Sequence, residues 1–232
     1  MSKIYCMSDI HGCLGEFEES LNLVMNHIKE NDVKLLLLGD YIHGGSDSYR
    51  VFDKIMDLQD VYGEDKVLAL MGNHEDFVTC GYSGIEEMMY GKNESESHGS
   101  REEDDYIRWM SYLPKYYKEG NTIFCHAGID EEAGELWEWG TSDDVFVGKY
   151  PADVGKIEGV DMKVVAGHVG TAEIADNPKF HEIFFDGESH YYIDGTVLDS
   201  GRIPVLLVDT ETDKYYQVTE NGAYIVPNYY EY

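Results

Sequence analysis

The chain has 232 residues, of which 43% are hydrophobic and 27% are charged. Such a length and composition are those of one globular domain with a sizeable core, and we expect residues 1–232 to form it. The formal net charge of −29 disfavours binding to duplex nucleic acid or to an anionic membrane, because like charges repel. No run has the features of a secretory leader or of a membrane-spanning helix. With four cysteines that lack a paired spacing, these features predict a reduced, cytoplasmic protein.

The first seventy or so residues alternate between apolar runs of strand length and amphipathic segments. The apolar runs are residues 3–8, 34–39 and 67–71. Between them, residues 16–30 and 48–59 carry apolar side chains at helical spacing, with polar side chains opposite. The order strand, helix, strand, helix, strand predicts parallel pairing with helical crossovers.

This alternation stops at residues 81–105, which are rich in glycine, serine and acidic residues. We interpret the segment as an insertion over the functional site, and the alternatives are a lid and a merely solvated loop. A helix is predicted next, at residues 106–113. Thr122–Cys125 and Lys163–Ala166 have the composition of buried strands, and residues 137–150 between them are predicted to form a loop.

The C-terminal part consists of short aromatic and β-branched runs, namely HEIFF, HYYID, IPVLLVD and KYYQVT. Their length and composition predict short antiparallel strands, with residues 209–213 as a hairpin turn. The last residues, 221–232, are again aromatic. They are predicted to form either a final edge strand or a loose tail.

Five short strings lie where a predicted strand gives way to a loop: SDIHG, LLLLGDYIHGG, ALMGNHED, FCHAG and VAGHVG. In open α/β sheets, ligands gather beyond the carboxyl ends of the strands, so residues far apart in sequence can converge there. The candidate metal ligands in these strings are Asp9, His11, Asp40, Asn73, His126 and His168. Carboxylate, amide oxygen and imidazole together suit Mn, Fe, Zn or Co better than Mg or Ca.

In this order, the five strings resemble the motifs of the calcineurin-like metallophosphoesterase superfamily. GNHE and HAG are most similar to its phosphoprotein phosphatase branch, which includes bacterial protein phosphatases and symmetrical diadenosine tetraphosphatases. Further likeness lies in GDYIHGGSDSYRVFDKI, YIRWMSYLPKYY and HYYIDGTVLDSGRIPVLLVD, so that roughly residues 3–210 are covered. The resemblance implies an α/β fold of the four-layer sandwich type, in which helices flank two mixed β-sheets.

The resemblance also implies the roles of these residues. One metal ion would be held by Asp9, His11 and Asp40. The other would be held by Asp40, Asn73, His126 and His168, so that one carboxylate bridges the two ions. Two divalent ions, Mn2+ foremost and Fe, Zn or Co as alternatives, would activate a water molecule for in-line attack on phosphorus. His74 would act as the general acid at the leaving group rather than as a ligand.

The chain departs from the family pattern at both positions where arginines commonly bind phosphate. Gly44 replaces the first arginine, and Trp139 stands in the place of the second. His43 replaces the aspartate that pairs with the general acid in the family. Losing both arginine forks should weaken phosphate binding by several kcal/mol, at about 1.5–3 kcal/mol for each charged hydrogen bond. His43 is interpreted as a phosphate contact, as a helper of His74, or as a replacement tolerated in a drifted enzyme.

Other substrate contacts are open. Trp139 is a candidate for stacking on a base or sugar, and Arg50 is one of several cations that could replace the lost clamp from another direction. The remaining candidates for such a clamp are Arg101, Arg108 and Lys149.

We expect a phosphoester hydrolase, foremost a phosphatase acting on a phosphoprotein or a small phosphorylated molecule. A phosphodiesterase or a nucleotide polyphosphate hydrolase is the alternative. A phosphate group with a single negative charge depends less on the missing arginines for binding than a doubly charged phosphomonoester does. A weakly active, metal-bound protein that binds a partner is the third reading, although such a protein would not need a complete set of ligands. The sequence does not predict an oligomeric state.

Overall fold

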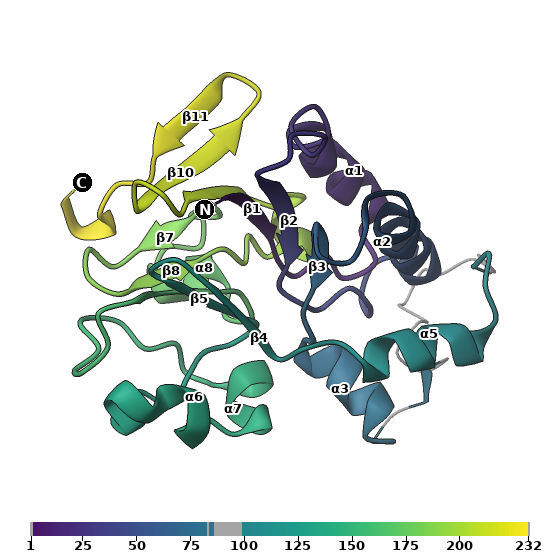
Figure 1. Ribbon diagram of the computed structural model, residues 1–232, viewed down its shortest axis with the longest axis horizontal. Coiled ribbons are helices and arrows are strands. Elements are labelled where there is room, and N and C mark those ends of the chain that lie inside the picture. The colour runs from purple at the N-terminus through teal and green to yellow at the C-terminus, as the bar shows by residue number, and fades with distance from the viewer. Residues whose placement is uncertain (1, 83, 86–98, 232) are drawn as a thin grey trace.

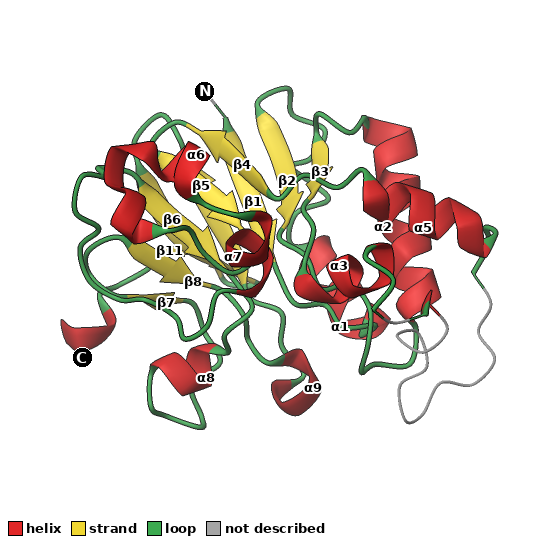
Figure 2. Ribbon diagram, turned by 90° about the horizontal axis from the view of Figure 1, so that it is seen from below, coloured by secondary structure: helices red, strands yellow, loops and turns green. Residues whose placement is uncertain are grey.

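Two mixed β-sheets form the centre of the molecule in this computed structural model, which describes residues 2–82, 84–85 and 99–231 (Figures 1 and 2). The six-stranded sheet has the order β11-β10-β9-β1-β2-β3. Its strands are β1 (Lys3–Met7), β2 (Val33–Leu37), β3 (Val67–Ala69), β9 (Val205–Asp209), β10 (Lys214–Thr219) and β11 (Gly222–Ile225). The five-stranded sheet has the order β4-β5-β6-β8-β7. Its strands are β4 (Tyr116–Glu119), β5 (Thr122–Cys125), β6 (Lys163–Ala166), β7 (Phe184–Phe185) and β8 (His190–Tyr192).

Each sheet contains three neighbouring parallel strands. These are β1, β2 and β3 in one sheet, as the alternation of strands and helices predicts, and β5, β6 and β8 in the other. The remaining pairs are antiparallel, so the antiparallel prediction is confirmed for β7, β9 and β10. It is wrong for β8 on the side where that strand pairs with β6, because β7 is the edge strand and the β7–β8 hairpin returns the chain parallel to β6.

The helices cover the outer faces of the sheets. In Figure 1, α1 (Leu14–Asn22) and α2 (Ser48–Tyr62) lie beside β1–β3, whereas α6 (Trp137–Gly140) and α7 (Asp143–Gly148) lie beside β4 and β5. The remaining helical segments are α3 (Asn73–Thr79), α5 (Glu103–Ser111), η1 (Glu131–Leu136), α8 (Thr171–Ile174), α9 (Val197–Ser200) and η2 (Tyr229–Glu231). The predicted α/β sandwich of two mixed sheets and flanking helices is confirmed.

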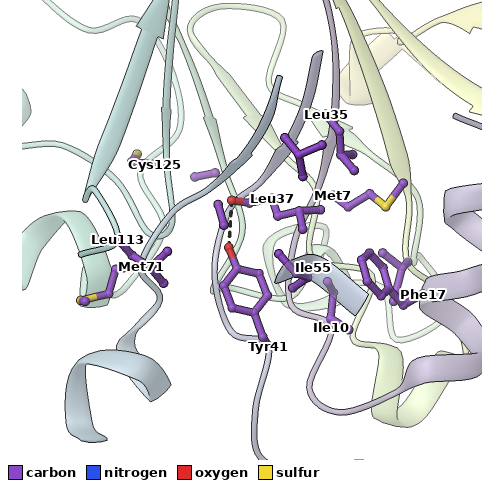
Figure 3. Close-up of a cluster of buried hydrophobic side chains, with 14 of the residues drawn as sticks. Met7, Ile10, Phe17, Leu35, Leu37, Tyr41, Ile55, Met71, Leu113 and Cys125 are labelled. Carbon is purple, nitrogen blue, oxygen red and sulfur yellow. Dashed lines mark hydrogen bonds between the residues drawn. The ribbon is translucent and has the colours of Figure 1, made fainter. Parts of the chain in front are cut away.

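Strand side chains alternate between two apolar cores, since successive residues of a strand point to opposite faces. In β1, Ile4 and Cys6 belong to the core between the sheets, together with residues of β5, β6 and β8. Tyr5 and Met7 belong to the core under the helices. Figure 3 shows part of this second core, where the ring of Tyr41 is fully buried and its hydroxyl donates to the Leu37 carbonyl at 3.0 Å.

Two predicted segments differ from the structure. The first helix ends at Asn22, and residues 23–29 continue as turns with i→i+3 hydrogen bonds, such as Val24 N–H to Leu21 O at 2.9 Å. Val24 and Ile28 are nevertheless buried, so the apolar stripe indicates burial although the backbone is not helical there. The predicted loop at 137–150 contains α6 and α7, which are too short to be stable alone and are held by tertiary packing.

Most of the predicted insertion at 81–105 lies outside the described residues, so neither the lid nor the solvated loop is tested. At its described end, Arg101 forms ion pairs with Asp53, Asp57 and Asp60 of α2. The four cysteines are free thiols. Within the described ranges, every helix is too short or too polar to cross a bilayer.

The candidate metal centre

The carboxyl ends of the six parallel strands converge on one cluster of polar side chains. β1, β2 and β3 are followed by Asp9 with His11, by Asp40, and by Asn73 with His74 at the start of α3. β5 and β6 are followed by His126 and His168. The structure therefore brings all six predicted ligands to one edge of the two sheets, as their positions after the strands predict.

Asp40 lies at the centre of this cluster. Its Oδ2 is 3.4 Å from His126 Nε2 and 3.7 Å from His11 Nε2. Two groups of ligand atoms share this carboxylate, namely His11–Asp40–His74 and Asp40–His126–His168, and within each group the atoms lie within 4.8 Å of one another. A carboxylate placed between two sets of imidazoles has the position that the predicted bridging role requires.

The other two predicted ligands lie against these groups. Asn73 Oδ1 is 3.0 Å from His126 Nε2, and Asp9 Oδ1 is 3.9 Å from His11 Nε2. The Asp9 carboxylate also accepts the backbone N–H of His168, with Oδ2 at 3.0 Å. Residues 9, 73 and 168 thus belong to the same cluster.

The backbone is turned to an unusual conformation at these positions. Asp9, His11, Asp40, His43 and His168 have φ between 48° and 72°. They are five of the eight non-glycine residues with positive φ in the described part of the chain. Since this conformation is uncommon for residues with a Cβ and tends to gather at functional sites, the turns after the strands are held against a local energetic preference.

Glu75 holds one of these turns in place. Its fully buried carboxylate accepts the backbone N–H groups of Asp40 at 2.9 Å, Tyr41 at 2.8 Å and Gly72 at 3.1 Å. The same residue therefore ties the start of α3 to the turn after β2. The motif GNHE contains this residue, but sequence analysis did not assign it a role.

Two glycines allow the strand ends to approach each other closely. A Cβ on Gly72 would lie 2.2 Å from Asp40 Oδ1, and one on Gly167 would lie 2.1 Å from Asp9 Oδ2 and from Ser8 Oγ. Such distances are far below van der Waals contact. The absence of a side chain at each glycine thus leaves room for the carboxylate of a predicted ligand.

Burial and neighbouring charges shift the pKa values of several acids in this site. Burial, together with the Asp40 carboxylate, raises the pKa of Glu75 to about 7. Burial and Asp9 raise the pKa of Asp194 to about 8. For Asp40 itself, burial tends to raise the pKa, but the imidazoles led by His126 outweigh it and hold the pKa well below its usual range. Within the described ranges, the ion pairs of Asp9 and Asp40 are with histidines alone.

This donor set fits two divalent cations. A buried carboxylate is costly unless a cation or hydrogen-bond donors compensate its charge, and no lysine or arginine pairs with Asp9 or Asp40 among the described residues. One group would hold an ion through Asp9, His11 and Asp40, and the other through Asp40, Asn73, His126 and His168. Three imidazoles among the ligands favour a transition metal over Mg2+ or Ca2+.

Asp194 is a residue of this region that sequence analysis missed. Tyr192 pairs with Ala166, and the Ile193 N–H donates to Ala166 O at 2.8 Å, so the end of β8 brings Asp194 to the cluster, within electrostatic reach of Asp9, His11 and Asp40. The Asp194 carboxylate accepts the Thr196 N–H at 2.7 Å. A strand-end acid in the string HYYID was the available signal, because every assigned ligand also follows a strand.

The remaining predicted site residues have different positions. His43 stacks on His74 at the edge of the cluster, with ring centroids 4.8 Å apart. Trp139 is 90% exposed on α6. Arg50 is exposed on α2 and forms an ion pair with Asp47 at 3.1 Å. The roles of His43, Trp139 and Arg50 in substrate binding or catalysis stay predictions.

A two-sheet sandwich with an Asp, Asn and His cluster at the carboxyl edge defines a class of metal-dependent protein. Comparison of the sequence with known families identifies the family within this class. The chain belongs to the calcineurin-like phosphoesterase family, whose sequence profile matches residues 2–207. Members of this family use a dinuclear centre of divalent metal ions, in agreement with the two ligand groups that share Asp40.

Several known proteins are similar to the chain over part of its length. The symmetrical bis(5'-nucleosyl)-tetraphosphatase of Nitrosospira multiformis is 28% identical over 54% of this chain and 43% of its own. The Shewanella-like protein phosphatase 1 of Plasmodium berghei is 30% identical over 55% of this chain and 39% of its own. The matched part thus spans less than half of these relatives. The crystal structure of a cold-active protein-tyrosine phosphatase of a psychrophilic Shewanella species shares the fold, with a TM-score of 0.66, 16% identity, and 98% and 81% coverage.

Proposed function

We propose that this protein hydrolyses a phosphoester at a centre of two divalent metal ions. The observation that carries the proposal is the Asp40 carboxylate, which lies between the imidazoles of His11 and His126. Divalent ions held there would lower the pKa of a water molecule and polarise the phosphoryl oxygens. Mn2+ is our first candidate, and Fe, Zn or Co ions are alternatives.

The chain's own residues would position the reacting groups. Asn73 supplies a neutral oxygen, which limits the negative charge that an incoming phosphate meets. Asp40 is fixed by Glu75 and stays between the two ligand groups. His74 lies next to Asp40, with Nε2 3.6 Å from Oδ2, at a place where it would face the leaving-group oxygen. This arrangement supports hydrolysis without a covalent intermediate on the protein.

No arginine is free to bind the phosphate in the described part of the chain, which favours a substrate whose attacked phosphate group carries little charge. All four arginines form ion pairs with carboxylates outside the cluster, and the pairs are Arg50–Asp47, Arg101 with three aspartates of α2, Arg108–Asp105 and Arg202–Glu182. At Gly44, where the family has an arginine, φ is 113° and a Cβ would lie 2.6 Å from Leu198 Cδ1. A side chain at this position would therefore meet both backbone strain and α9.

This observation keeps two substrate classes in view. A phosphatase acting on a phosphoprotein or a small phosphorylated molecule would need a cation from elsewhere to bind the dianion. A phosphodiester, or an internal phosphate of a nucleotide polyphosphate, carries one charge and an additional organic arm. The tetraphosphatase names of several relatives support the second class.

The test loads the protein with Mn2+ and compares hydrolysis of p-nitrophenyl phosphate with that of bis-p-nitrophenyl phosphate. The Asp40→Asn variant is the negative control, because it lacks the carboxylate charge that the two metal ions would share. Monoester preference supports the phosphatase, and diester preference supports the second class. If the metal-loaded protein turns over neither ester, the hydrolase proposal is contradicted and a partner-binding role is favoured.

A further inference from the structure

Two exposed aromatic rings extend outward from the edge of the metal centre. The Phe77 ring meets the His74 ring with 6.1 Å between centroids, and the Tyr82 ring meets the Phe77 ring at 6.4 Å. Phe77 is 41% exposed and Tyr82 is 79% exposed. The three side chains therefore form a row of rings that begins beside Asp40 and ends in solvent.

The local sequence holds the two outer rings in place. His74 and Phe77 are three residues apart on α3, so they lie on the same face of the helix. Beyond the end of α3, Gly81 has a φ of 74° and its N–H donates to Val78 O at 3.1 Å. The Tyr82 N–H donates to Phe77 O at 2.9 Å. These are the bonds of a Schellman turn, which brings together the side chains of residues 77 and 82 before any ligand binds.

The turn accounts for the contact between the two rings but not for their exposure. Any apolar pair would make such a contact, and rings that stay largely in water contribute little burial to the fold. Aromatic side chains commonly line ligand sites, because their faces stack on planar groups. The place of Phe77 and Tyr82 next to His74 therefore points to a role in holding a ligand.

The charges of the chain indicate which part of a substrate these rings would hold. All four arginines form ion pairs with carboxylates outside the metal centre, so no arginine fork adds to the binding of the phosphate. Contacts with the organic arm of the substrate would supply binding energy instead. A nucleobase suits this role, since it stacks on aromatic side chains without a charged partner.

The extent of the row favours a nucleobase over the ring of an aryl phosphate. An aryl ring is bonded directly to the ester oxygen, so beside His74 it would reach Phe77 at most. In a nucleotide, the ribose separates the base from the phosphate. A base could thus lie on Tyr82, which is two ring contacts away from His74.

We propose that Phe77 and Tyr82 form a nucleobase-binding subsite, and that the substrate is a nucleotide whose attacked phosphate is a diester or lies inside a polyphosphate chain. The inference rests on the proposed hydrolase function and deepens it by choosing between its two substrate classes. Stacking of one base on an aromatic side chain raises affinity about tenfold.

The test measures binding rather than rate. Calorimetry of Mn2+-loaded protein compares adenosine 5′-(α,β-methylene)diphosphate with methylenediphosphonate, which have the same P–C–P group with and without a nucleoside. We expect the wild-type protein to bind the nucleotide at least about tenfold more tightly. Phe77→Leu and Tyr82→Leu keep an apolar contact in the turn but lack a ring, so each should remove most of this advantage. Tyr82→Phe should retain it.

Two further variants determine where the base binds. Tyr224→Leu is the matched control, because this exposed tyrosine lies on β11, on the opposite side of the molecule from α3 (Figure 1), and it should leave the advantage unchanged. Trp139→Leu tests the exposed tryptophan that the sequence singles out for stacking. Loss of the advantage in Trp139→Leu, with no loss in the Phe77 and Tyr82 variants, would overturn the inference.

The absence of any nucleoside advantage in the wild-type protein would overturn it as well. So would tighter binding of phenylphosphonate than of methylphosphonate without a gain for the nucleotide, since the rings would then hold an aryl phosphate. These results leave the hydrolase proposal standing, because the ester assay tests that proposal separately. If neither ester is hydrolysed but the ring variants lose the nucleoside advantage, the subsite is supported and the hydrolase proposal alone is contradicted.

Discussion

Glu75 and Asp40 are joined by a buried hydrogen bond of 2.9 Å, from the Asp40 backbone N–H to the Glu75 carboxylate. The same carboxylate accepts the next N–H along the chain, at Tyr41, and the N–H of Gly72 at its own helix start. The carboxylate predicted to bridge the two metal ions therefore depends on a second acid, which binds backbone N–H groups. This relationship makes the site's geometry part of the stability of the fold.

Glu75→Ala should lower both stability and metal affinity. The change leaves four buried N–H groups without an acceptor, those of Asp40, Tyr41, Ile42 and Gly72, each at about 1–3 kcal/mol, so the free energy of unfolding should fall by at least about 4 kcal/mol. Mn2+ affinity should fall about 10–100-fold, as when other supports of metal ligands are lost. Urea unfolding in the presence of a chelator and calorimetric titration with Mn2+ measure the two effects. Glu64→Ala, at an exposed position, should change the free energy by less than about 0.5 kcal/mol.

Asp40→Asn and His74→Asn should separate metal binding from proton transfer. The first removes the shared charge, so we expect loss of bound metal and of hydrolysis together. The second leaves the predicted ligands intact, and it should slow hydrolysis of esters with poor leaving groups while metal content stays near two ions per chain. Elemental analysis after dialysis against Mn2+ measures metal content. Equal metal loss in the two variants would make His74 a ligand, consistent with its position beside His11 and Asp40.

Gly167→Ala should displace a ligand rather than merely perturb a loop. The new Cβ would lie 2.1 Å from Asp9 Oδ2, so the carboxylate or the strand end must shift, and we expect weakened binding of one of the two metal ions. Gly15→Ala is the matched control, because nothing lies within 4 Å of its Cβ. It should stabilise the fold by about 0.4–1 kcal/mol without changing metal binding. Unchanged metal stoichiometry and affinity in Gly167→Ala would contradict this view of the site.

A second buried charge cluster should make stability depend on pH. His190 is buried between Asp186, with Nδ1 to Oδ2 at 2.7 Å, and Glu131, with Nε2 to Oε1 at 2.9 Å. Burial by itself lowers the pKa of His190, but the hydrogen bonds to Asp186 and Glu131 outweigh it and raise the pKa to about 9. Because this exceeds the unfolded value of about 6.5, the contribution is fully present below pH 6.5 and is lost as the pH rises through about 9.

His190→Gln should therefore remove a pH dependence on the alkaline side. From about pH 6 to about pH 10, the wild-type free energy of unfolding should fall by about 3 kcal/mol more than that of the variant. Urea unfolding at several pH values in this window measures the difference. Parallel curves for the two proteins would show that His190 does not titrate with a raised pKa.

The sequence by itself determined the parallel order of β1, β2 and β3 and the identity of the six candidate ligands. Both depend on local patterns, since an apolar run of strand length ends where a polar motif begins. The same reasoning overextended the first helix to residue 30, because Val24 and Ile28 are buried at helical spacing in a segment of turns.

Only the tertiary structure decided what holds and surrounds these ligands. Glu75 binds a turn about 35 residues before it, and Asp194 reaches the cluster through the pairing of β6 with β8. His43 lies face to face with His74, and the arginines pair with carboxylates elsewhere. A motif shows which side chains are present at a strand end. Packing between segments distant in the chain decides the direction in which each side chain points and which group compensates its charge. No local pattern encodes that packing.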